Sequence, residues 1–515
     1  MSSGADRPAS ERLVALMARI RWPGWAAVAA VYAVSWSGVW RAGEDSAGLI
    51  VAAREAAAGG GWASAGGPGL VAVGAGMFRL WPGDALAVAA GLAAVSWMLA
   101  LAGIVAVYRL IRLREGPGLA AGVAFTLAAA DLWHQHALEA LPDAWFACGA
   151  ALALWGYERY AQRVEGPRWV TAVLLVAGVV LMISTRSVGL VFVAALGIAE
   201  GARAARAKRW KALAVGAGAS VVGLVVAHGV LVAPAAPWTL HPDVALAAGK
   251  LTTHLPATAG QAWSENLPHL LWEAAPEALF GMDPGHAGPL AGGVAVVLGV
   301  ALLRLRLLWG VWFCLLLVQW VVFVPTDRYV LPVLPVLVYA YWKACIGANR
   351  WVARRIAGWS MHVRRASGVG FVALLGLLYA PNALRVVRTV GVQHAEPFYE
   401  RYRDGKYVPW LEASGWLQEN AADGAAVVTP DEAPYAELAV WSGLRVGSSK
   451  WTGEGRRGLL VEAKPLAERG AVSLHGWRRG ELLYETEAVD RKGRTVRVRR
   501  SWRGDAGANP GAAGP

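Results

Sequence analysis

Residues 84–108, DALAVAAGLAAVSWMLALAGIVAVY, carry no charge after the first position, and the basic run RLIRLR follows at 109–114. A helix needs about 20 consecutive apolar residues to cross the hydrocarbon core of a bilayer. In lipid, the backbone N–H and C=O groups must be paired within the segment, so such a stretch is expected to be helical. The stretch therefore predicts a transmembrane helix with a basic flank on one side of the membrane.

Similar apolar stretches recur along the chain. Of the 515 residues, 56% are hydrophobic and only 17% are charged, whereas soluble domains are about a quarter charged. The first stretch has no small-residue cleavage site behind it and is expected to remain as an uncleaved helix. We predict about eleven spans, near residues 23–40, 84–108, 116–132, 143–157, 169–184, 187–200, 212–233, 289–303, 307–324, 329–346 and 368–387.

The basic residues predict the orientation of these spans. With the N-terminus inside, the segments on the cytoplasmic side carry 23 Lys and Arg residues, and the outer loops carry six. Lys and Arg are enriched in the cytoplasmic loops of membrane proteins. We therefore expect a multi-pass protein of the plasma (inner) membrane with a cytoplasmic N-terminus. An odd number of spans then puts the C-terminus outside.

The chain changes character after the last span. We expect an all-α polytopic helix bundle over residues 1–388, an extracytoplasmic soluble α/β domain over 389–502, and a disordered tail, rich in Gly, Ala and Pro, over 503–515. Within the soluble domain, WLEASGWLQENAA (410–422) predicts an amphipathic helix. Alternating apolar residues predict short strands at 424–429, 457–463, 471–477, 481–488 and 495–502.

The formal net charge of +13 would also suit a nucleic-acid-binding protein. The Lys and Arg residues cluster between apolar runs instead, so we expect no nucleic-acid partner. Cys148, Cys314 and Cys345 lie within apolar runs without metal-ligand spacing. His134 and His136 are two positions apart, so they would not share a helix face. We expect no required cofactor, with a divalent cation at the outer acids as the alternative.

A few ionisable residues stand at the predicted outer face, where charge is otherwise sparse. The first outer loop contains SAGLIVAAREAAAGG (46–60), which predicts an amphipathic helix with Leu49, Ile50, Ala53 and Ala57 on one face. The ionisable residues are Asp45 before this helix, Glu139 and Asp143 around the start of the fourth span, Arg186 between the fifth and sixth, and Arg328 before the tenth.

Each of these residues also has a structural interpretation. Asp45 would cap a helix that begins at Ser46. Asp143 follows Pro142 in a first helical turn, where the helix dipole favours an acid. Arg328 would pair with its neighbour Asp327. As a set, however, they suit group transfer. Fixed cations stabilise the charge that develops on a phosphate leaving group, and a carboxylate accepts the proton of the acceptor.

The order of these residues resembles that in the polyprenol-phosphate-sugar-dependent glycosyltransferases of the GT-C fold. This superfamily includes protein O-mannosyltransferases of glycosyltransferase family 39 and lipid A aminoarabinose transferases. The resemblance extends over most of 23–346. Its segments are GEDSAGLIVAAREAAAGGGWASAGGPGL (43–70), LEALPDAWF (138–146), TRSVGL (185–190) and RYVLPVLP (328–335). The family's Lys-Pro-Pro segment after the first acid is absent, as is the Pro-Glu pair that often follows the arginine of the third segment.

The resemblance implies roles for these residues. Asp45 would be the catalytic base, although Glu44 before it is the alternative. Asp143 would be a second acid of the catalytic site, either shaping the site or holding a cation. Arg186 and Arg328 would contact the phosphate of the donor, with Tyr329 and Glu139 beside them as further substrate-binding residues.

We therefore predict an inverting membrane glycosyltransferase that moves a sugar from a polyprenyl-phosphate-linked donor to an acceptor lipid, glycan or protein outside the cytoplasm. Its partners would be this donor, membrane lipid and an acceptor that the sequence does not identify. The alternatives are a secondary transporter, which would show repeated halves and charges at mid-depth, and a non-catalytic protein that binds lipid-linked sugar.

Overall fold

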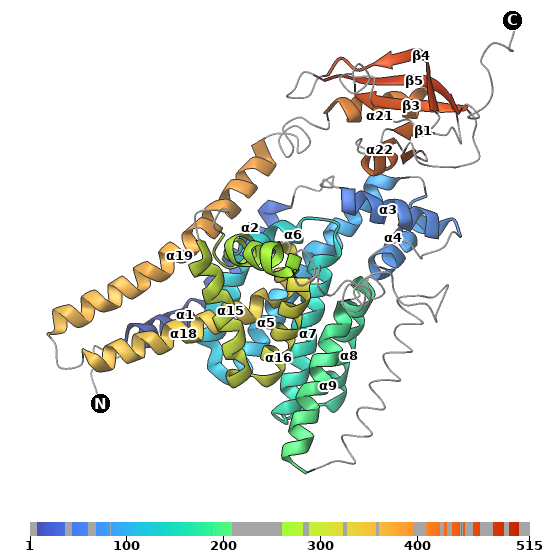
Figure 1. The fold of residues 1–515 in the computed structure, drawn as a ribbon. Coiled ribbons are helices and arrows are strands. Elements are labelled where there is room, and N and C mark those ends of the chain that lie inside the picture. Colours follow the sequence, from blue (N-terminus) through green and yellow to red (C-terminus); the bar gives the residue numbers. More distant parts are fainter. Residues whose placement is uncertain are drawn as a thin grey trace, which may run out of the picture. The chain divides into compact units, whose positions relative to one another are not determined.

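The protein, seen in a computed structural model, is mostly helical with one small sheet (Figure 1). It forms two compact units, which are described separately. The first comprises residues 1–36, 66–70 and 93–390, and the second comprises 37–65, 71–92 and 391–515. The structure describes residues 8–36, 44–59, 68–82, 84–186, 188–208, 260–281, 288–322, 327–356, 360–395, 408–422, 427–429, 435–442, 444, 446–448, 457–463, 477–488 and 494–503.

Helices occupy ten of the eleven stretches predicted to span the membrane, and the other stretch, 212–233, lies outside the described residues. The helices of the N-terminal half are α1 (Ala9–Arg19), α2 (Arg21–Ser35), α3 (Glu44–Ala57), α4 (Pro68–Leu80), α5 (Ala85–Ala128), α6 (Asp131–Ala137), α7 (Pro142–Ala161), α8 (Arg168–Thr185) and α9 (Gly189–Arg206).

The second half of the bundle begins with a segment in which α-helix alternates with π-helix. This segment contains η3 (Ala262–Asn266), α13 (Leu267–His269), η4 (Leu270–Ala274) and α14 (Ala275–Phe280). The helices after it are α15 (Gly288–Leu305), α16 (Leu307–Val322), α17 (Asp327–Val330), the 3₁₀ turn η5 (Leu331–Val333), α18 (Leu334–Arg355) and α19 (Met361–Ala395).

Among the described helices, three are long and apolar enough to cross a membrane. They are Ala85–Ala128, Arg168–Thr185 and Arg328–Arg355. The pair α6 and α7 meets the same criteria together but bends by 114° between the two helices. The count of about eleven spans therefore stays a prediction.

The break in α5 differs from the predicted one. The basic run 109–114, which lies between two predicted spans, is helical, and the backbone leaves helical geometry at Gly116, where φ is 81° and ψ is 173°. A positive φ of this kind is favourable only for glycine, and Pro117 then cannot donate a backbone hydrogen bond. Arginine is a good helix former, so the helix continues through the basic run and bends at Gly116.

In the second unit, α3 packs against α22 (Tyr435–Ser442) of the C-terminal part of the chain. Leu49, Ile50 and Ala53 are buried, as the amphipathic pattern predicted. The Arg54 guanidinium donates hydrogen bonds to the backbone oxygens of Ala439 (3.4 Å) and Leu444 (3.0 Å). The helix predicted within 46–60 is thus confirmed, and it is part of the same unit as the C-terminal domain.

The C-terminal domain has a five-stranded mixed sheet with the strand order β2-β1-β3-β5-β4. Its strands are β1 (Val427–Thr429), β2 (Val446–Ser448), β3 (Arg457–Ala463), β4 (Trp477–Glu485) and β5 (Val496–Arg503). The pairs β1–β2 and β1–β3 are parallel, whereas β3–β5 and β4–β5 are antiparallel. Strand β2 was not predicted, and the strand predicted at 471–477 lies outside the described residues except for Trp477.

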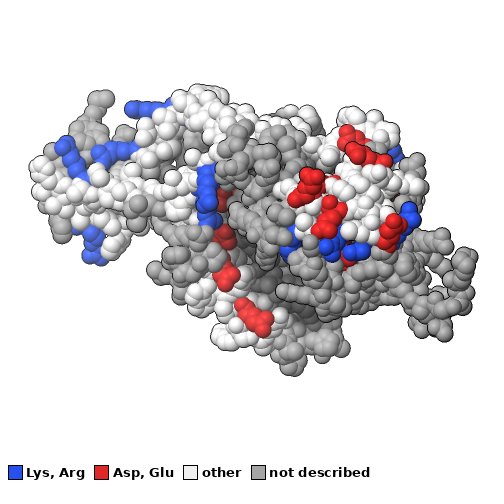
Figure 2. Space-filling view, turned by 90° about the horizontal axis from the view of Figure 1, so that it is seen from above, with Lys and Arg blue, Asp and Glu red and all other residues white. Residues whose placement is uncertain are grey.

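Charged residues of the sheet form cross-strand ion pairs. Arg497 Nε lies 2.9 Å from Glu485 Oε2, and Arg499 Nε lies 3.4 Å from Glu462 Oε1. On the right of the face shown in Figure 2, acidic and basic side chains likewise lie next to one another. Part of the basic charge of the C-terminal domain is therefore compensated within the domain.

The Glu412 carboxylate connects the predicted amphipathic helix α21 (Val408–Asn420) to the sheet through hydrogen bonds. Glu412 accepts hydrogen bonds from the Tyr484 hydroxyl and from the backbone N–H groups of Glu487 and Ala488, the latter two at 2.8 Å. Trp416 stacks on Tyr484 with ring centroids 5.4 Å apart. Burial acts to raise the pKa of Glu412, but these hydrogen bonds outweigh it and hold the pKa below its usual value.

The lowered pKa of Glu412 predicts that the stability of this domain depends on pH. Folding lowers the pKa of Glu412. The contribution of its carboxylate to the free energy of unfolding is therefore complete above the unfolded pKa of about 4.3, and it disappears as the pH falls through the folded pKa. Glu412→Gln should cost about 1 kcal/mol near pH 7, allowing for its partly exposed position, and nothing at acidic pH. Hydrogen exchange of residues 408–422 in the full-length protein measures this. Glu419→Gln, an exposed position on the same helix, is the control, and an equal effect of both variants would contradict the prediction.

Candidate active site

The close packing of α7 against α8 brings the start of one helix beside the end of the other (Figure 1). Glycines allow this approach: a Cβ atom on Gly178 would lie 2.4 Å from the backbone nitrogen of Ala153, and one on Gly149 would lie 2.8 Å from the Gly178 oxygen. Small residues of this kind let membrane helices pack backbone to backbone. Because the helices are antiparallel neighbours, Asp143 in the first turn of α7 meets Arg186 at the C-terminal end of α8.

Asp143 and Arg186 form an ion pair with two short contacts. Arg186 Nη2 lies 2.7 Å from Oδ1 and 2.9 Å from Oδ2 of Asp143. The Asp143 side chain is 2% exposed, whereas that of Arg186 is 20% exposed. Among the described residues, the buried Nε of Arg186 has no hydrogen-bond partner. Since a guanidinium carries five N–H donors, Arg186 can hold Asp143 and still offer donors to a second anion.

Arg328 and Tyr329, on α17, complete the cluster. The Arg186 Cζ atom lies 5.3 Å from the centroid of the Tyr329 ring, and the Arg328 Cζ atom lies 5.5 Å from it. Both arginines are thus within cation–π distance of one ring, and both act electrostatically on the Asp143 carboxylate. Two guanidinium groups thus lie near one aromatic ring and one carboxylate, an arrangement that suits an anionic ligand.

The structure therefore brings together four of the seven predicted site residues: Asp143, Arg186, Arg328 and Tyr329. Glu139 lies in the α6–α7 bend, and its Oε2 is 3.0 Å from Nδ1 of His136. Sequence analysis did not identify this His136 contact.

Glu44 and Asp45 lie in the first turn of α3, in the second unit. The helix begins at Glu44, so Asp45 is a residue of the first turn and not the cap expected before Ser46. Its side chain is exposed. A carboxylate at this end of a helix is favoured by the helix dipole.

A second polar cluster lies at the other end of α7. Glu158 is fifteen positions after Asp143, which corresponds to about 22 Å along a helix. It lies 2.9 Å from Arg114 Nη2. Beside it, Glu115 accepts hydrogen bonds from the Tyr339 hydroxyl at 2.7 Å and from Lys343 Nζ at 3.0 Å.

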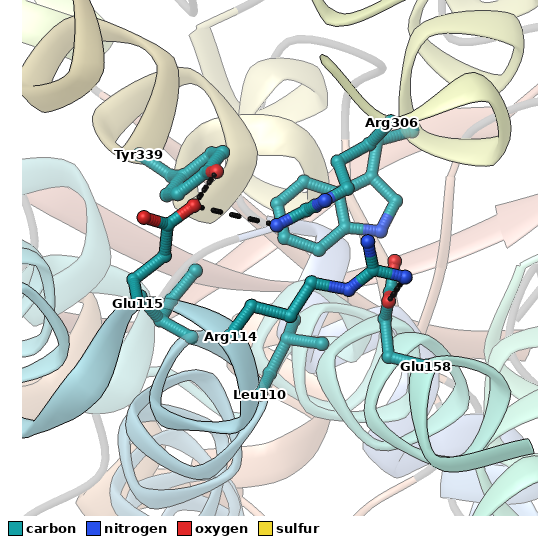
Figure 3. Close-up of a pocket in the computed structure, with 8 residues that line it drawn as sticks. Leu110, Arg114, Glu115, Glu158, Arg306 and Tyr339 are labelled. Carbon is teal, nitrogen blue, oxygen red and sulfur yellow. Dashed lines mark hydrogen bonds and ion pairs between the residues drawn. The ribbon is translucent and has the colours of Figure 1, made fainter. Parts of the chain in front are cut away.

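Figure 3 shows this cluster as a small recess in which Glu115 faces Tyr339 and Arg306, and Arg114 turns toward Glu158. Arg306 Nη2 lies 3.4 Å from Glu115 Oε1. Each of these arginines and carboxylates has an ion-pair partner, although Nε of Arg306 is buried without a hydrogen-bond partner among the described residues. The recess therefore joins α5, α7, α18 and the α15–α16 turn. It contains none of the predicted site residues.

This link predicts a loss of stability in Glu115→Gln. The variant keeps the shape of the side chain but leaves Arg306 and Lys343 without their anion. We expect the free energy of unfolding to fall by about 2 kcal/mol, measured by thermal or denaturant unfolding of the full-length protein in detergent. Glu165→Gln, an exposed carboxylate after α7, should have no effect. An unchanged stability of Glu115→Gln would show that the network contributes nothing.

Among the described residues, no group of three or more His, Cys, Asp or Glu side chains could hold a metal ion. The metal-dependence of the protein stays a prediction. The three cysteines form no disulfide bond with one another.

No model of a known protein family and no curated protein sequence matches the chain. Among solved structures, it is similar to ArnT from Cupriavidus metallidurans bound to undecaprenyl phosphate, with a TM-score of 0.56 and 16% identity over 92% of this chain and 97% of that chain. The apo state of the same ArnT gives a TM-score of 0.54 with the same identity and coverage.

ArnT is a lipid A aminoarabinose transferase with the GT-C fold. The likeness includes the helix bundle and the C-terminal domain, because it extends over nearly all of both chains. Together with the apolar helices, it identifies the chain as a membrane protein with the GT-C fold.

Proposed function

We propose that the protein is an inverting glycosyltransferase that moves a sugar from a polyprenyl-phosphate-linked donor to an acceptor on the non-cytoplasmic side of the membrane. The main support is the cluster of Asp143, Arg186 and Arg328. There, two guanidinium groups lie near one ring, and one Arg186 N–H group has no partner among the described residues, which suits a phosphate. The fold is a second support, because ArnT, which shares it, binds undecaprenyl phosphate.

In the proposed reaction, a nucleophile of the acceptor attacks the anomeric carbon of the sugar. The bond from this carbon to the phosphate oxygen breaks, and the polyprenyl phosphate leaves from the opposite face, so the configuration inverts. Asp45, or Glu44 in its place, accepts the proton of the nucleophile. Arg186 and Arg328 stabilise the charge that develops on the leaving phosphate.

Asp143 would act through Arg186 in this mechanism. It is nearly fully buried, and both of its oxygens are engaged by the same guanidinium nitrogen. A carboxylate so occupied suits the orientation of a cation better than proton transfer. We assign Asp143 the role of holding Arg186 toward the donor phosphate, with Tyr329 supporting both arginines.

The decisive experiment compares envelope glycans and lipids by mass spectrometry with and without the gene product. Loss of one sugar from a defined lipid, glycan or protein supports the transferase and identifies the acceptor. A wild-type profile, together with flux of a solute that depends on the protein, would support a secondary transporter. A wild-type profile with retained binding of lipid-linked sugar would support a non-catalytic binding protein.

Arg328 provides a test of the donor phosphate site. Arg328→Ala should weaken the affinity for a polyprenyl phosphate about tenfold or more, and Arg328→Lys should weaken it less, because only arginine presents a planar pair of donors. The affinity is measured on folded protein in lipid nanodiscs. If Arg328 only paired with its neighbour, Asp327→Asn would reduce folded protein as much as Arg328→Ala, and both would retain wild-type affinity.

A further inference from the structure

A buried asparagine of α19 joins two helix ends that come from distant parts of the chain. Asn382 is 1% exposed. Its Oδ1 accepts a hydrogen bond from the backbone N–H of Asp131 at 3.0 Å, at the start of α6, where Ala130 provides no side-chain cap. Its Nδ2 donates to the backbone oxygen of Leu279 at 3.3 Å, at the end of α14. One amide therefore caps both helices.

The contact between α14 and α19 is close enough to require a glycine. Gly281 ends α14 with a φ of 62°, in the left-handed region. A Cβ atom there would lie 2.5 Å from Asn382 Oδ1. Both the backbone conformation and the available space thus exclude a side chain, so the chain turns at this point in direct contact with Asn382.

Arg385, one turn further along α19, connects the same two helices a second time. Its Nη1 lies 3.2 Å from Glu277 Oε1 on α14 and 3.6 Å from Asp131 Oδ2 on α6. Asp131 is 3% exposed and also accepts a hydrogen bond from Gln135 Nε2 at 2.8 Å. We call Asn382 and Arg385 the α19 bridge.

The two helices that the α19 bridge holds are adjacent to the candidate active site. The short helix α17, which carries Arg328 and Tyr329, packs against both α6 and α14. After α6, the chain bends by 114° into α7, and Asp143 lies in the first turn of α7. Any shift of α6 or α14 would therefore move the residues that surround the donor phosphate in our proposal.

We propose that Asn382 and Arg385 are positioning residues, which fix α6 and α14 so that Arg328 and the Asp143–Arg186 pair converge on one anion. This inference rests on the proposed function, since it concerns the same site. In this role each residue acts through the helices that it holds. A displacement of about 1 Å is enough to reduce the efficiency of a preorganised site greatly.

The test uses full-length protein in lipid nanodiscs. Its variants are Asn382→Leu, Arg385→Gln and Arg385→Lys, with Arg388→Gln, an exposed position on the same helix, as the matched control. Two quantities are measured: the affinity for a polyprenyl phosphate, and hydrogen exchange of the amides in 131–137 and 327–330. We expect Asn382→Leu and Arg385→Gln to weaken affinity about tenfold and to speed exchange in both segments, Arg385→Lys to recover part of the affinity, and Arg388→Gln to match wild type.

A double variant separates positioning from a general loss of stability. Because Arg385 is expected to act partly through the placement of Arg328, Arg385→Gln should weaken affinity by a smaller factor in an Arg328→Ala background than in the wild-type background. A full additional loss there, or wild-type affinity in Arg385→Gln despite faster exchange, would overturn the positioning role. If Asn382→Leu does not fold, the Arg385 series decides alone. If wild-type protein binds no polyprenyl phosphate, the proposed function fails, and exchange in 327–330 alone then decides whether the bridge fixes α17.

Discussion

Replacing Asp45 by Asn should reduce the rate of sugar transfer by about 10²–10⁴-fold, the usual effect of losing a general base. The amide keeps the shape of the side chain but cannot accept the proton of the nucleophile. Affinity for a polyprenyl phosphate should stay at the wild-type value, because Arg186 and Arg328 are unchanged. Transfer is measured by mass spectrometry of the product identified above, and affinity on the purified protein.

Two further variants on α3 make this test specific. Glu44→Gln should reduce the rate less than Asp45→Asn, and a reversed order would assign the base to Glu44. Glu55→Gln is the control, because Glu55 is an exposed acid on the same helix and should leave the rate unchanged. Wild-type rates in both Asp45→Asn and Glu44→Gln would remove the general base from the proposed mechanism.

Much of the fold could be predicted from hydrophobicity alone. Long apolar runs must be helical in lipid, and this rule located the helices in ten predicted stretches without any knowledge of their packing. It did not identify α1, α4 or the segment from η3 to α14. It failed where local geometry decides the boundary. The bend of α5 occurs at Gly116 and not at the preceding arginines, because arginine does not break a helix. Strand β2 (VGS) has one apolar residue in three, so no apolar pattern identifies it, whereas β1 (VVT) lies in an apolar run.

The candidate site could be predicted only as a set of residues on one side of the membrane. The pairing of Asp143 with Arg186 depends on the close approach of α7 and α8 at Gly149 and Gly178, which the sequence of either helix does not reveal. The α19 bridge was missed for the same reason. Asn382 is a single polar residue within an apolar run, and its partners Asp131 and Leu279 lie 251 and 103 positions away.

The second large effect that we expect is a loss of both stability and phosphate affinity when Arg186 is replaced. Arg186→Met removes the cation that pairs with the nearly fully buried Asp143. Loss of one partner of a buried ion pair costs about 3–5 kcal/mol, so this variant should unfold at clearly lower denaturant concentration than wild type. It should also lose affinity for a polyprenyl phosphate, because the guanidinium group that we propose as a phosphate contact disappears.

The loss of stability and the loss of affinity can be separated. Two uncharged side chains at these positions destabilise the fold much less than one buried charge without its partner. The double variant Arg186→Met with Asp143→Leu should recover most of the lost stability. Its affinity should nevertheless remain about tenfold or more below wild type, as expected for loss of a charge-assisted hydrogen bond to phosphate. Arg168→Met, at the exposed other end of α8, is the control and should change neither quantity. If the double variant bound a polyprenyl phosphate as wild type does, Arg186 would serve only to neutralise Asp143, and the donor phosphate would have to be held elsewhere.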